Sequence, residues 1–286
     1  MGNIIEIRNL KKVYKRFSLC IEKIEIQEGT ITGLIGKNGA GKTTLINCLM
    51  NIIDSTYDIY TFNQKELNYS DFEFRAEIGY VGDSFDAYQN IKLSDITNFY
   101  KSVYGDKWNN EKYNSYMELF DLDATKKVSE ISKGMKIKYQ FALVLSREVK
   151  FLLLDEPTSG LDPIIREDIL SILQKESKKN KVTVLFSSHI TEDIERIATD
   201  LIFIDNGRII LHGSLNSIKS RFKIIDKEII GSKLSSNFVQ QNDFSIIDTM
   251  NIDENMLDGF HDHLKECDLS QILVCVNGEN NVKSNC

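Results

Sequence analysis

The chain has 286 residues, of which 42% are hydrophobic and 27% charged, a balance typical of a globular protein with one large core and at most a small appendage. Its formal net charge of −7 argues against nucleic acid as the main partner. No stretch approaches about eighteen consecutive apolar residues, so we expect no membrane-spanning helix, and the odd number of scattered cysteines indicates free thiols in a reducing cytoplasm.

The N-terminal part of the chain has the alternation of apolar and polar residues that is typical of β-strands. Residues 4–7 alternate loosely and residues 19–26 alternate well. Gly29 then provides a turn into a short apolar run at residues 31–35, which predicts a further strand. We therefore expect residues 3–30 to be rich in β-structure.

A glycine-rich motif follows that strand. Residues 36–44 have the sequence GKNGAGKTT, which fits the pattern G-x-x-x-x-G-K-S/T, and residues 45–50 predict a helix. Such a turn points backbone N–H groups inward, so it forms a pocket for the β- and γ-phosphates of a nucleotide. Lys42 is expected to reach the phosphate oxygens, and Thr43 to place its hydroxyl on Mg²⁺. The alternative is an ordinary strand-to-helix turn that happens to contain glycines.

The middle of the chain predicts one strand and then a helical region. Residues 76–83 indicate the strand, whereas residues 92–148 lack strand patterns. Ser132 is the expected N-cap of a helix in the second half of this region. A hydroxyl and Gly134 at a helix N-terminus form a possible anion site, although the pattern alone favours a plain capped helix.

A second motif, which is acidic, lies at the end of an apolar run. Residues 151–156 predict a buried strand that ends in Asp155 and Glu156. Strands of doubly wound folds deliver their last residues to the edge where ligands bind. Asp155 is therefore placed to hold the hydration shell of Mg²⁺, and Glu156 to act as a general base. The alternative is a strand followed by a solvated acidic turn.

The patterns after this motif predict a helix, two strands and a weaker C-terminal region. Asp162 is the expected cap of a helix over residues 164–178, a strand at 182–187 precedes His189, and a second strand is expected at residues 201–204. Beyond about residue 223 the patterns weaken. Short runs there predict strands at residues 226–234, 244–249 and 272–276 and a helix at 255–267. A small α/β appendage, a dimer contact and a partly ordered tail all remain open for this region.

In their order, these motifs resemble those of the nucleotide-binding subunit of ABC transporters, over roughly residues 3–220. Residues 36–44 resemble Walker A, residues 131–135 the signature, residues 152–156 Walker B and residues 159–162 the D-loop. His189 resembles the switch histidine. The resemblance implies an α/β fold, with a P-loop NTPase core, an N-terminal antiparallel β subdomain and an α-helical subdomain at about 92–148. It places the ABC ATPase domain at residues 1–222 and leaves 223–286 as a small C-terminal extension of unknown role.

The resemblance also implies the roles of individual residues, with ATP and Mg²⁺ as cofactors. The implied catalytic residues are Glu156 and His189, and the implied metal ligands are Thr43, Asp155 and Asp83. The implied nucleotide-binding residues are Tyr14, Gly36, Asn38, Gly39, Ala40, Gly41, Lys42, Thr43, Thr44, Ser132, Gly134 and Asp162. Two departures stand out: the signature has the sequence ISKGM, and Asp83 occupies the place where the family usually has glutamine.

The function implied is that of an ATP-hydrolysing subunit that powers a separate membrane permease. Two subunits, as a homodimer or pseudo-dimer, would bind each ATP between Lys42 and Thr43 of one and Ser132 and Gly134 of the other. The subunit would lie on the cytoplasmic face of the membrane, held by a permease docked around residues 83–100. In these two departures the chain resembles exporters of the bacitracin- and lantibiotic-resistance type. This resemblance implies a drug-, peptide- or lantibiotic-like cargo. The alternatives are a soluble ABC ATPase without a permease and an ATP-sensing regulator.

Overall fold

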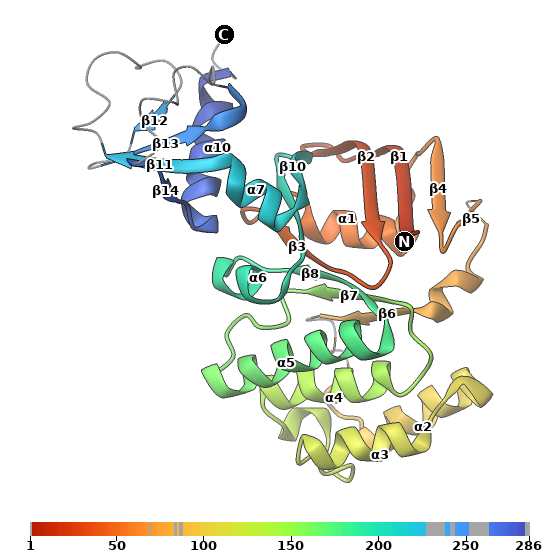
Figure 1. Ribbon diagram of the computed structural model, residues 1–286. Helices are drawn as coiled ribbons and strands as arrows, with labels where there is room; N and C mark the ends of the chain where they lie inside the picture. The colour runs from red at the N-terminus through yellow and green to blue at the C-terminus, as the bar shows by residue number, and fades with distance from the viewer. Residues whose placement is uncertain are drawn as a thin grey trace. The chain divides into compact units, whose positions relative to one another are not determined.

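The computed structural model describes residues 2–68, 70–82, 85, 88–226, 238–240, 244–251 and 263–283. These residues form two compact units (Figure 1). The first contains residues 1–198 and 202–211, and the second contains residues 199–201 and 212–286. None of the helices in the described part of the chain has the length and apolarity that crossing a bilayer requires. No disulfide joins the described cysteines.

An antiparallel sheet forms the N-terminal part of the first unit. Its strands, in the spatial order β2-β1-β4-β5, are β1 (Asn3–Val13), β2 (Ser18–Gln27), β4 (Ile59–Phe62) and β5 (Lys65–Glu66). Strand β1 pairs with β2 along nearly its whole length and with β4 on its other side. The apolar residues of the alternating pattern are buried on one face of this sheet, as the sequence predicts.

A six-stranded sheet forms the centre of the fold, in the order β10-β9-β3-β8-β7-β6. Its strands are β3 (Ile31–Ile35), β6 (Ile78–Val81), β7 (Phe151–Asp155), β8 (Thr183–Ser187), β9 (Asp200–Asp205) and β10 (Arg208–Ser214). Strands β3, β8, β7 and β6 are parallel neighbours. Their near-continuous apolar sequences are buried on both faces, as is typical of parallel sheets. Parallel strands end at one edge, so the residues that follow β3, β7 and β8 meet there.

Helices cover both faces of the central sheet (Figure 1). Helix α1 (Lys42–Leu49) lies between the two sheets, and its buried Leu45, Ile46 and Leu49 belong to the core that joins them. The other face carries helices α4 (Lys133–Leu145), α5 (Pro163–Asn180) and α6 (Thr191–Ile197). At Gly79 of β6 this packing is so close that a Cβ would lie 2.3 Å from a methyl of Val144 on α4.

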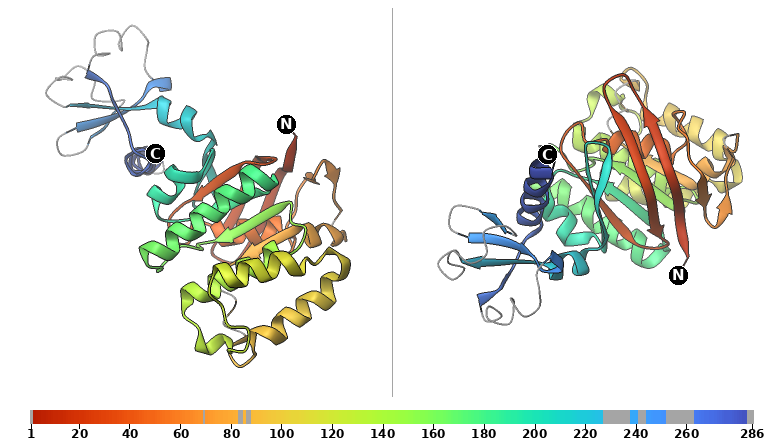
Figure 2. Two further views of the ribbon diagram at one scale, coloured as in Figure 1. Left: turned by 60° about the horizontal axis from the view of Figure 1, so that its bottom comes forward. Right: turned by 90° about the horizontal axis from the view of Figure 1, so that it is seen from above.

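Residues 92–148 form the predicted helical region. Helices α2 (Leu93–Tyr104) and α3 (Asn110–Leu119) lie beside α4 at one end of this unit, in yellow and yellow-green in Figures 1 and 2. The buried hydroxyl of Thr97 hydrogen-bonds to the hydroxyls of Tyr113 and Tyr139, both at 2.8 Å. One hydrogen-bonded cluster thus joins all three helices, and burial raises the pKa of Tyr139. Single 3-10 turns occur at Glu73–Glu77, Gly105–Lys107, Val128–Glu130 and, in the second unit, Thr249–Asn251.

The second unit is a small α/β structure. It contains helices α7 (Leu215–Arg221) and α10 (Leu269–Lys283) and a sheet of β11 (Phe222–Asp226), β12 (Phe238–Gln240), β13 (Phe244–Asp248) and β14 (Lys265–Glu266). Strand β13 confirms the strand predicted at 244–249. The strand predicted at 272–276 is wrong, because this run is part of α10. Its buried Ile272 and Cys275 repeat with Leu269 at helical spacing.

The remaining C-terminal expectations fall partly outside the described residues. The predicted helix at 255–267 is wrong where it can be checked, because Lys265–Glu266 forms β14 and pairs with β11. Residues 255–262 lie outside the described residues, as do 227–234 of the strand predicted at 226–234. Asp226 itself ends β11.

Candidate functional site

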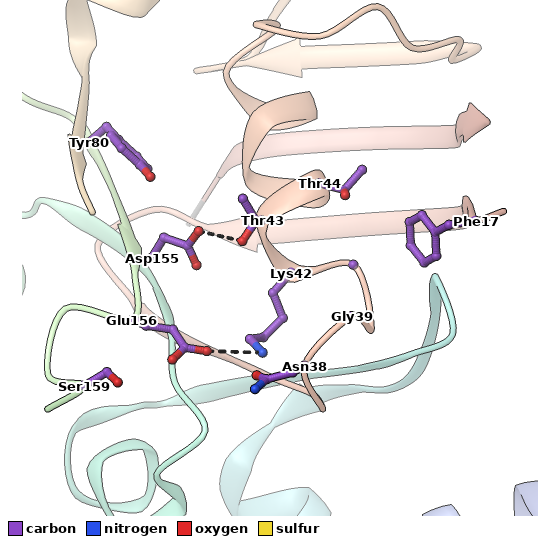
Figure 3. A pocket seen from close by; sticks show the side chains of 11 residues that line it. Phe17, Asn38, Gly39, Lys42, Thr43, Thr44, Tyr80, Asp155, Glu156 and Ser159 are labelled. Atoms are coloured by element: carbon purple, nitrogen blue, oxygen red, sulfur yellow. Dashed lines mark hydrogen bonds and ion pairs between the residues drawn. The ribbon is translucent and has the colours of Figure 1, made fainter. Parts of the chain in front are cut away.

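A cavity of about 590 Å³ lies at the carboxyl edge of the central sheet, over the start of α1 (Figure 3). It brings together eight of the residues predicted from the sequence. These are Asn38, Gly39, Gly41, Lys42, Thr43, Thr44, Asp155 and Glu156. Residues more than a hundred positions apart in the chain therefore form one site, because β3 and β7 end at the same edge of the sheet.

Glycines shape the loop that enters α1. Gly39 and Gly41 have φ angles of 83° and 112°, in the region that favours glycine. A Cβ at Gly36 would lie 2.4 Å from the backbone oxygen of Ile204, so the loop packs directly on β9. Within the described structure no side chain caps the N-terminus of α1. Its first N–H groups are therefore available to an anion, and the helix dipole favours negative charge there.

Lys42 supplies a positive charge to the floor of this cavity. Its side chain is only 6% exposed, and its Nζ donates to the backbone oxygen of Gly36 at 2.9 Å. The same atom lies 3.3 Å from Oε1 of Glu156, the ion pair drawn in Figure 3. Lys42 thus lies beside the helix N-terminus, where its charge would also attract an anionic ligand.

Two oxygens that suit a divalent cation face each other across the cavity. Asp155 ends β7 and Thr43 lies in the first turn of α1, and the Thr43 hydroxyl donates to Oδ2 of Asp155 at 2.7 Å. A hydroxyl and a carboxylate are hard donors of the kind that Mg²⁺ binds, so this pair fits the predicted metal. Asp83, the third predicted ligand, lies outside the described residues.

Glu156 and His189 form the predicted catalytic pair. Nδ1 of His189 lies 2.8 Å from Oε2 of Glu156, and the Glu156 side chain is 26% exposed. The Glu156 backbone has a φ of 52°, which is uncommon for a residue other than glycine. This turn directs the carboxylate toward Lys42 and His189 rather than along the strand. A carboxylate held there can accept a proton from water in the cavity.

Seven predicted residues in the described part of the chain do not line the cavity: His189, which contacts Glu156 from outside the lining, Tyr14, and five others. Ala40 is a buried residue of the loop, and Gly36 packs on β9. Ser132 and Asp162 cap α4 and α5, where they accept hydrogen bonds from backbone N–H groups of their own helices. Gly134 lies in the first turn of α4. The roles of Ser132, Gly134 and Asp162 toward nucleotide stay predictions.

The structure places a different aromatic residue beside the loop than the sequence suggests. Phe17 lines the cavity, whereas Tyr14 does not and is 45% exposed. The two belong to one turn, in which the Tyr14 N–H donates to the Phe17 oxygen at 2.8 Å. In Figure 3 Phe17 lies across the loop from Asp155. Stacking of Tyr14 on adenine stays a prediction.

Sequence reasoning missed other residues around the site. Tyr80 lines the cavity, as does Ser159, which the resemblance included in the D-loop without giving it a role, and buried Gln140 of α4 accepts a hydrogen bond from the Gly82 N–H at 3.2 Å. Ser187 contacts both Asp155 and Glu156. Tyr80 is the second-last residue of β6 and Ser187 the last of β8, and that position could have marked them.

The chain is similar in sequence to known proteins. A protein-family model described as ABC transporter matches residues 22–159. The uncharacterized ABC transporter ATP-binding protein YhaQ of Bacillus subtilis is 30% identical over 207 residues, which cover 70% of this chain and 67% of that protein. The lantibiotic transport ATP-binding protein SrtF of Streptococcus pyogenes is 30% identical over 232 residues, which cover 80% and 99%. The chain belongs to the ABC transporter family.

Solved structures agree with the fold of this ABC ATPase. The structure of an ATP-binding subunit of an ABC transporter has a TM-score of 0.67 at 24% identity, and the match covers 76% of this chain and 92% of that one. The predicted α/β class with a P-loop NTPase core is thus confirmed. The chain is an ATP-binding subunit with ATPase activity. Other relatives at similar identity are named as bacitracin transport and methionine import ATP-binding proteins.

Proposed function

We propose that this ABC ATPase hydrolyses ATP in the cavity over α1 and powers a separate membrane permease. One observation carries the proposal: Lys42, Thr43, Asp155, Glu156 and His189 converge at one edge of the sheet with contacts of 2.7–3.3 Å. These groups supply, in one place, the anion site, the cation site and the base that phosphoryl transfer to water requires.

The geometry suggests how nucleotide prepares the site. Lys42 now contacts Glu156, and phosphate oxygens over the N-terminus of α1 would draw its Nζ away. Oε1 of Glu156 would then be free to accept a proton from the attacking water, while His189 holds the other oxygen. Thr43 and Asp155 would hold Mg²⁺, which neutralises charge on the phosphates when bound.

A second chain would complete each site. Ser132 and Gly134 lie at the start of α4 and do not line the cavity, which supports a contact with a nucleotide held by another subunit. One structural relative at 20% identity is described as the dimeric structure of a post-hydrolysis state of an ATP-binding cassette bound to ADP and Pi. ATP between two chains would close the pair and hydrolysis would release it, a switch driven by differential binding.

An apolar groove on α2 supports docking of a permease. The groove has a volume of about 450 Å³ and is lined mainly by aromatic and branched side chains, among them Tyr88, Ile91, Phe99 and Val103. Phe99 and Val103 are 64% and 57% exposed. A contiguous exposed apolar patch marks an interaction site, and a permease helix on the membrane side would cover it. The ATPase would then be peripheral on the cytoplasmic face of the membrane.

The direction of transport is proposed as export. The names of SrtF and of the bacitracin protein BcrA support an antibiotic- or lantibiotic-like cargo, whereas the methionine import relatives support the opposite direction. The contact between Glu156 and His189 speaks against a sensor that does not hydrolyse ATP.

Substitution of the groove residues tests the permease proposal. We expect Phe99→Asp to lose a polytopic membrane protein that co-purifies with the tagged parent chain from detergent-solubilised host membranes, because a charge would face an apolar partner. Leu119→Asp is the matched control, since Leu119 is 63% exposed on α3 and lies outside the groove. Capture of soluble proteins alone by the parent chain would contradict the proposal.

A further inference from the structure

Ser187 occupies a central position below the catalytic edge. It is the last residue of β8, the strand between β3 of the glycine-rich loop and β7 of the two carboxylates. It lies directly opposite Asp155 in the β7–β8 register and opposite Leu34 in the β3–β8 register. Ser187 is completely buried, and a buried hydroxyl is expected to have hydrogen-bond partners.

The hydroxyl of Ser187 contacts both members of the acidic pair. It donates to Oδ1 of Asp155 at 2.8 Å and accepts from the backbone N–H of Glu156 at 2.9 Å. The hydroxyl therefore donates its proton to the carboxylate of Asp155, the expected cation ligand. It accepts a hydrogen bond from the backbone N–H of Glu156, the expected base.

The first hydrogen bond determines how the Asp155 carboxylate is turned. With Oδ1 held by Ser187, Oδ2 faces the Thr43 hydroxyl at 2.7 Å. Without Ser187, Oδ1 would lose this partner and the carboxylate could rotate away from Thr43. Partners of this kind orient metal-binding groups and commonly change metal affinity or activity by about 10–100-fold when removed.

The second hydrogen bond holds an unfavourable backbone conformation. Glu156 has a φ of 52°, which persists only where the surroundings enforce it. The N–H that Ser187 accepts belongs to this same residue. If the backbone relaxed, the side chain would turn away from Lys42 and His189.

We infer that Ser187 is a positioning residue, which through one buried hydroxyl sets both the Asp155 carboxylate toward Thr43 and the Glu156 carboxylate toward Lys42 and His189. It does not touch the nucleotide. Its effect should therefore appear in turnover and in the requirement for Mg²⁺, and much less in the affinity for ATP at saturating Mg²⁺. The inference concerns the chain's own residues and does not depend on a permease.

Isosteric variants separate the hydroxyl from packing. Ser187→Ala removes the hydroxyl without adding atoms. Ser187→Val and Ser187→Thr have the same shape, but only threonine keeps a hydroxyl. Thr183→Val is the control on the same strand: Thr183 is also completely buried, and its hydroxyl accepts the Gly29 N–H at 2.9 Å about 13 Å away from Ser187.

Three measurements on the full-length chain decide the inference: kcat and KM for ATP, the Mg²⁺ concentration that half-saturates binding of a non-hydrolysable ATP analogue, and thermal unfolding. We expect Ser187→Ala and Ser187→Val to lower kcat about 10–100-fold and to raise the Mg²⁺ requirement several-fold. KM at saturating Mg²⁺ should change less than about threefold, and Ser187→Thr and Thr183→Val should stay near the parent.

Other patterns would overturn it. If Ser187→Thr loses as much activity as Ser187→Val, packing rather than the hydroxyl is responsible. If Thr183→Val lowers kcat equally, the effect is general destabilisation of β8. If Ser187→Ala folds and keeps both kcat and the Mg²⁺ requirement within about twofold, Ser187 positions neither carboxylate.

Discussion

Replacement of Glu156 by glutamine is expected to lower ATP turnover by about 10²–10⁴-fold while ATP binding persists. The amide keeps the shape of the side chain and can still bond to His189, but it cannot take a proton from water. It also removes the negative charge that lies 3.3 Å from Lys42, so Lys42 becomes more available to phosphate. ATP affinity should therefore be equal to that of the parent or higher.

Turnover is measured on the purified variant in excess Mg²⁺, and ATP binding by filter retention or fluorescence. Glu192→Gln is the matched control, because Glu192 is an exposed carboxylate in the first turn of α6, close to His189 in sequence. It should keep the parent rate. Unchanged turnover in Glu156→Gln would remove this residue from the role of general base.

Replacement of Asp193 by alanine is expected to lower the free energy of unfolding by about 3 kcal/mol. The Asp193 side chain is 2% exposed and accepts from the Thr158 hydroxyl at 2.7 Å and from Nε of Arg166. These partners belong to the loop after Glu156 and to α5, while Asp193 itself lies on α6. Alanine would remove the acceptor of both donors. The loss lies at the low end for a buried pair because Arg166 is 30% exposed and stays partly hydrated.

Urea unfolding of the two chains measures this loss. Asp168→Ala is the matched control on α5: its partner is Lys138 at 2.8 Å, but Asp168 is 47% exposed, so the expected loss is below about 1 kcal/mol. Thr158 lies two residues after Glu156, and Asp193 lies four residues after His189. We therefore expect the ATPase activity of Asp193→Ala to fall as well. Equal stability of the two variants would contradict a structural role for the buried carboxylate.

Local chemistry made most of the site predictable from the sequence. The glycines of residues 36–41 permit a backbone that few other residues can adopt, so the pattern itself indicates an anion loop. Asp155 and Glu156 follow an apolar strand, and the ends of parallel strands meet at one edge. The two motifs could therefore be placed together without knowing how the strands pair.

Long-range pairing accounts for what was not predicted around the site. The strand end could have marked Ser187 as close to the site, but its contact with Asp155 depends on the pairing of β8 with β7, which no local pattern reveals. Phe17 rather than Tyr14 reaches the cavity wall because the turn between β1 and β2 decides which aromatic faces the loop. Both depend on contacts that form only in the folded chain.

The C-terminal unit shows a second reason why a sequence pattern can predict the wrong element. The run at residues 272–276 is short and apolar, and periodicity alone cannot separate a buried strand from part of a buried helix. Asp268 decides the outcome locally, because its side chain accepts from the Gln271 N–H at 2.8 Å and so caps α10. An N-cap aspartate just before the run was the signal that could have identified the helix.

The most direct test of the account is a crystal structure of the Glu156→Gln variant with ATP and Mg²⁺. We predict the triphosphate over the N-terminus of α1, the metal ion bound by the Thr43 hydroxyl near Asp155, and Ser132 and Gly134 of a second chain facing the γ-phosphate. Nucleotide bound elsewhere, or bound over α1 with no second chain at Ser132, would contradict the account.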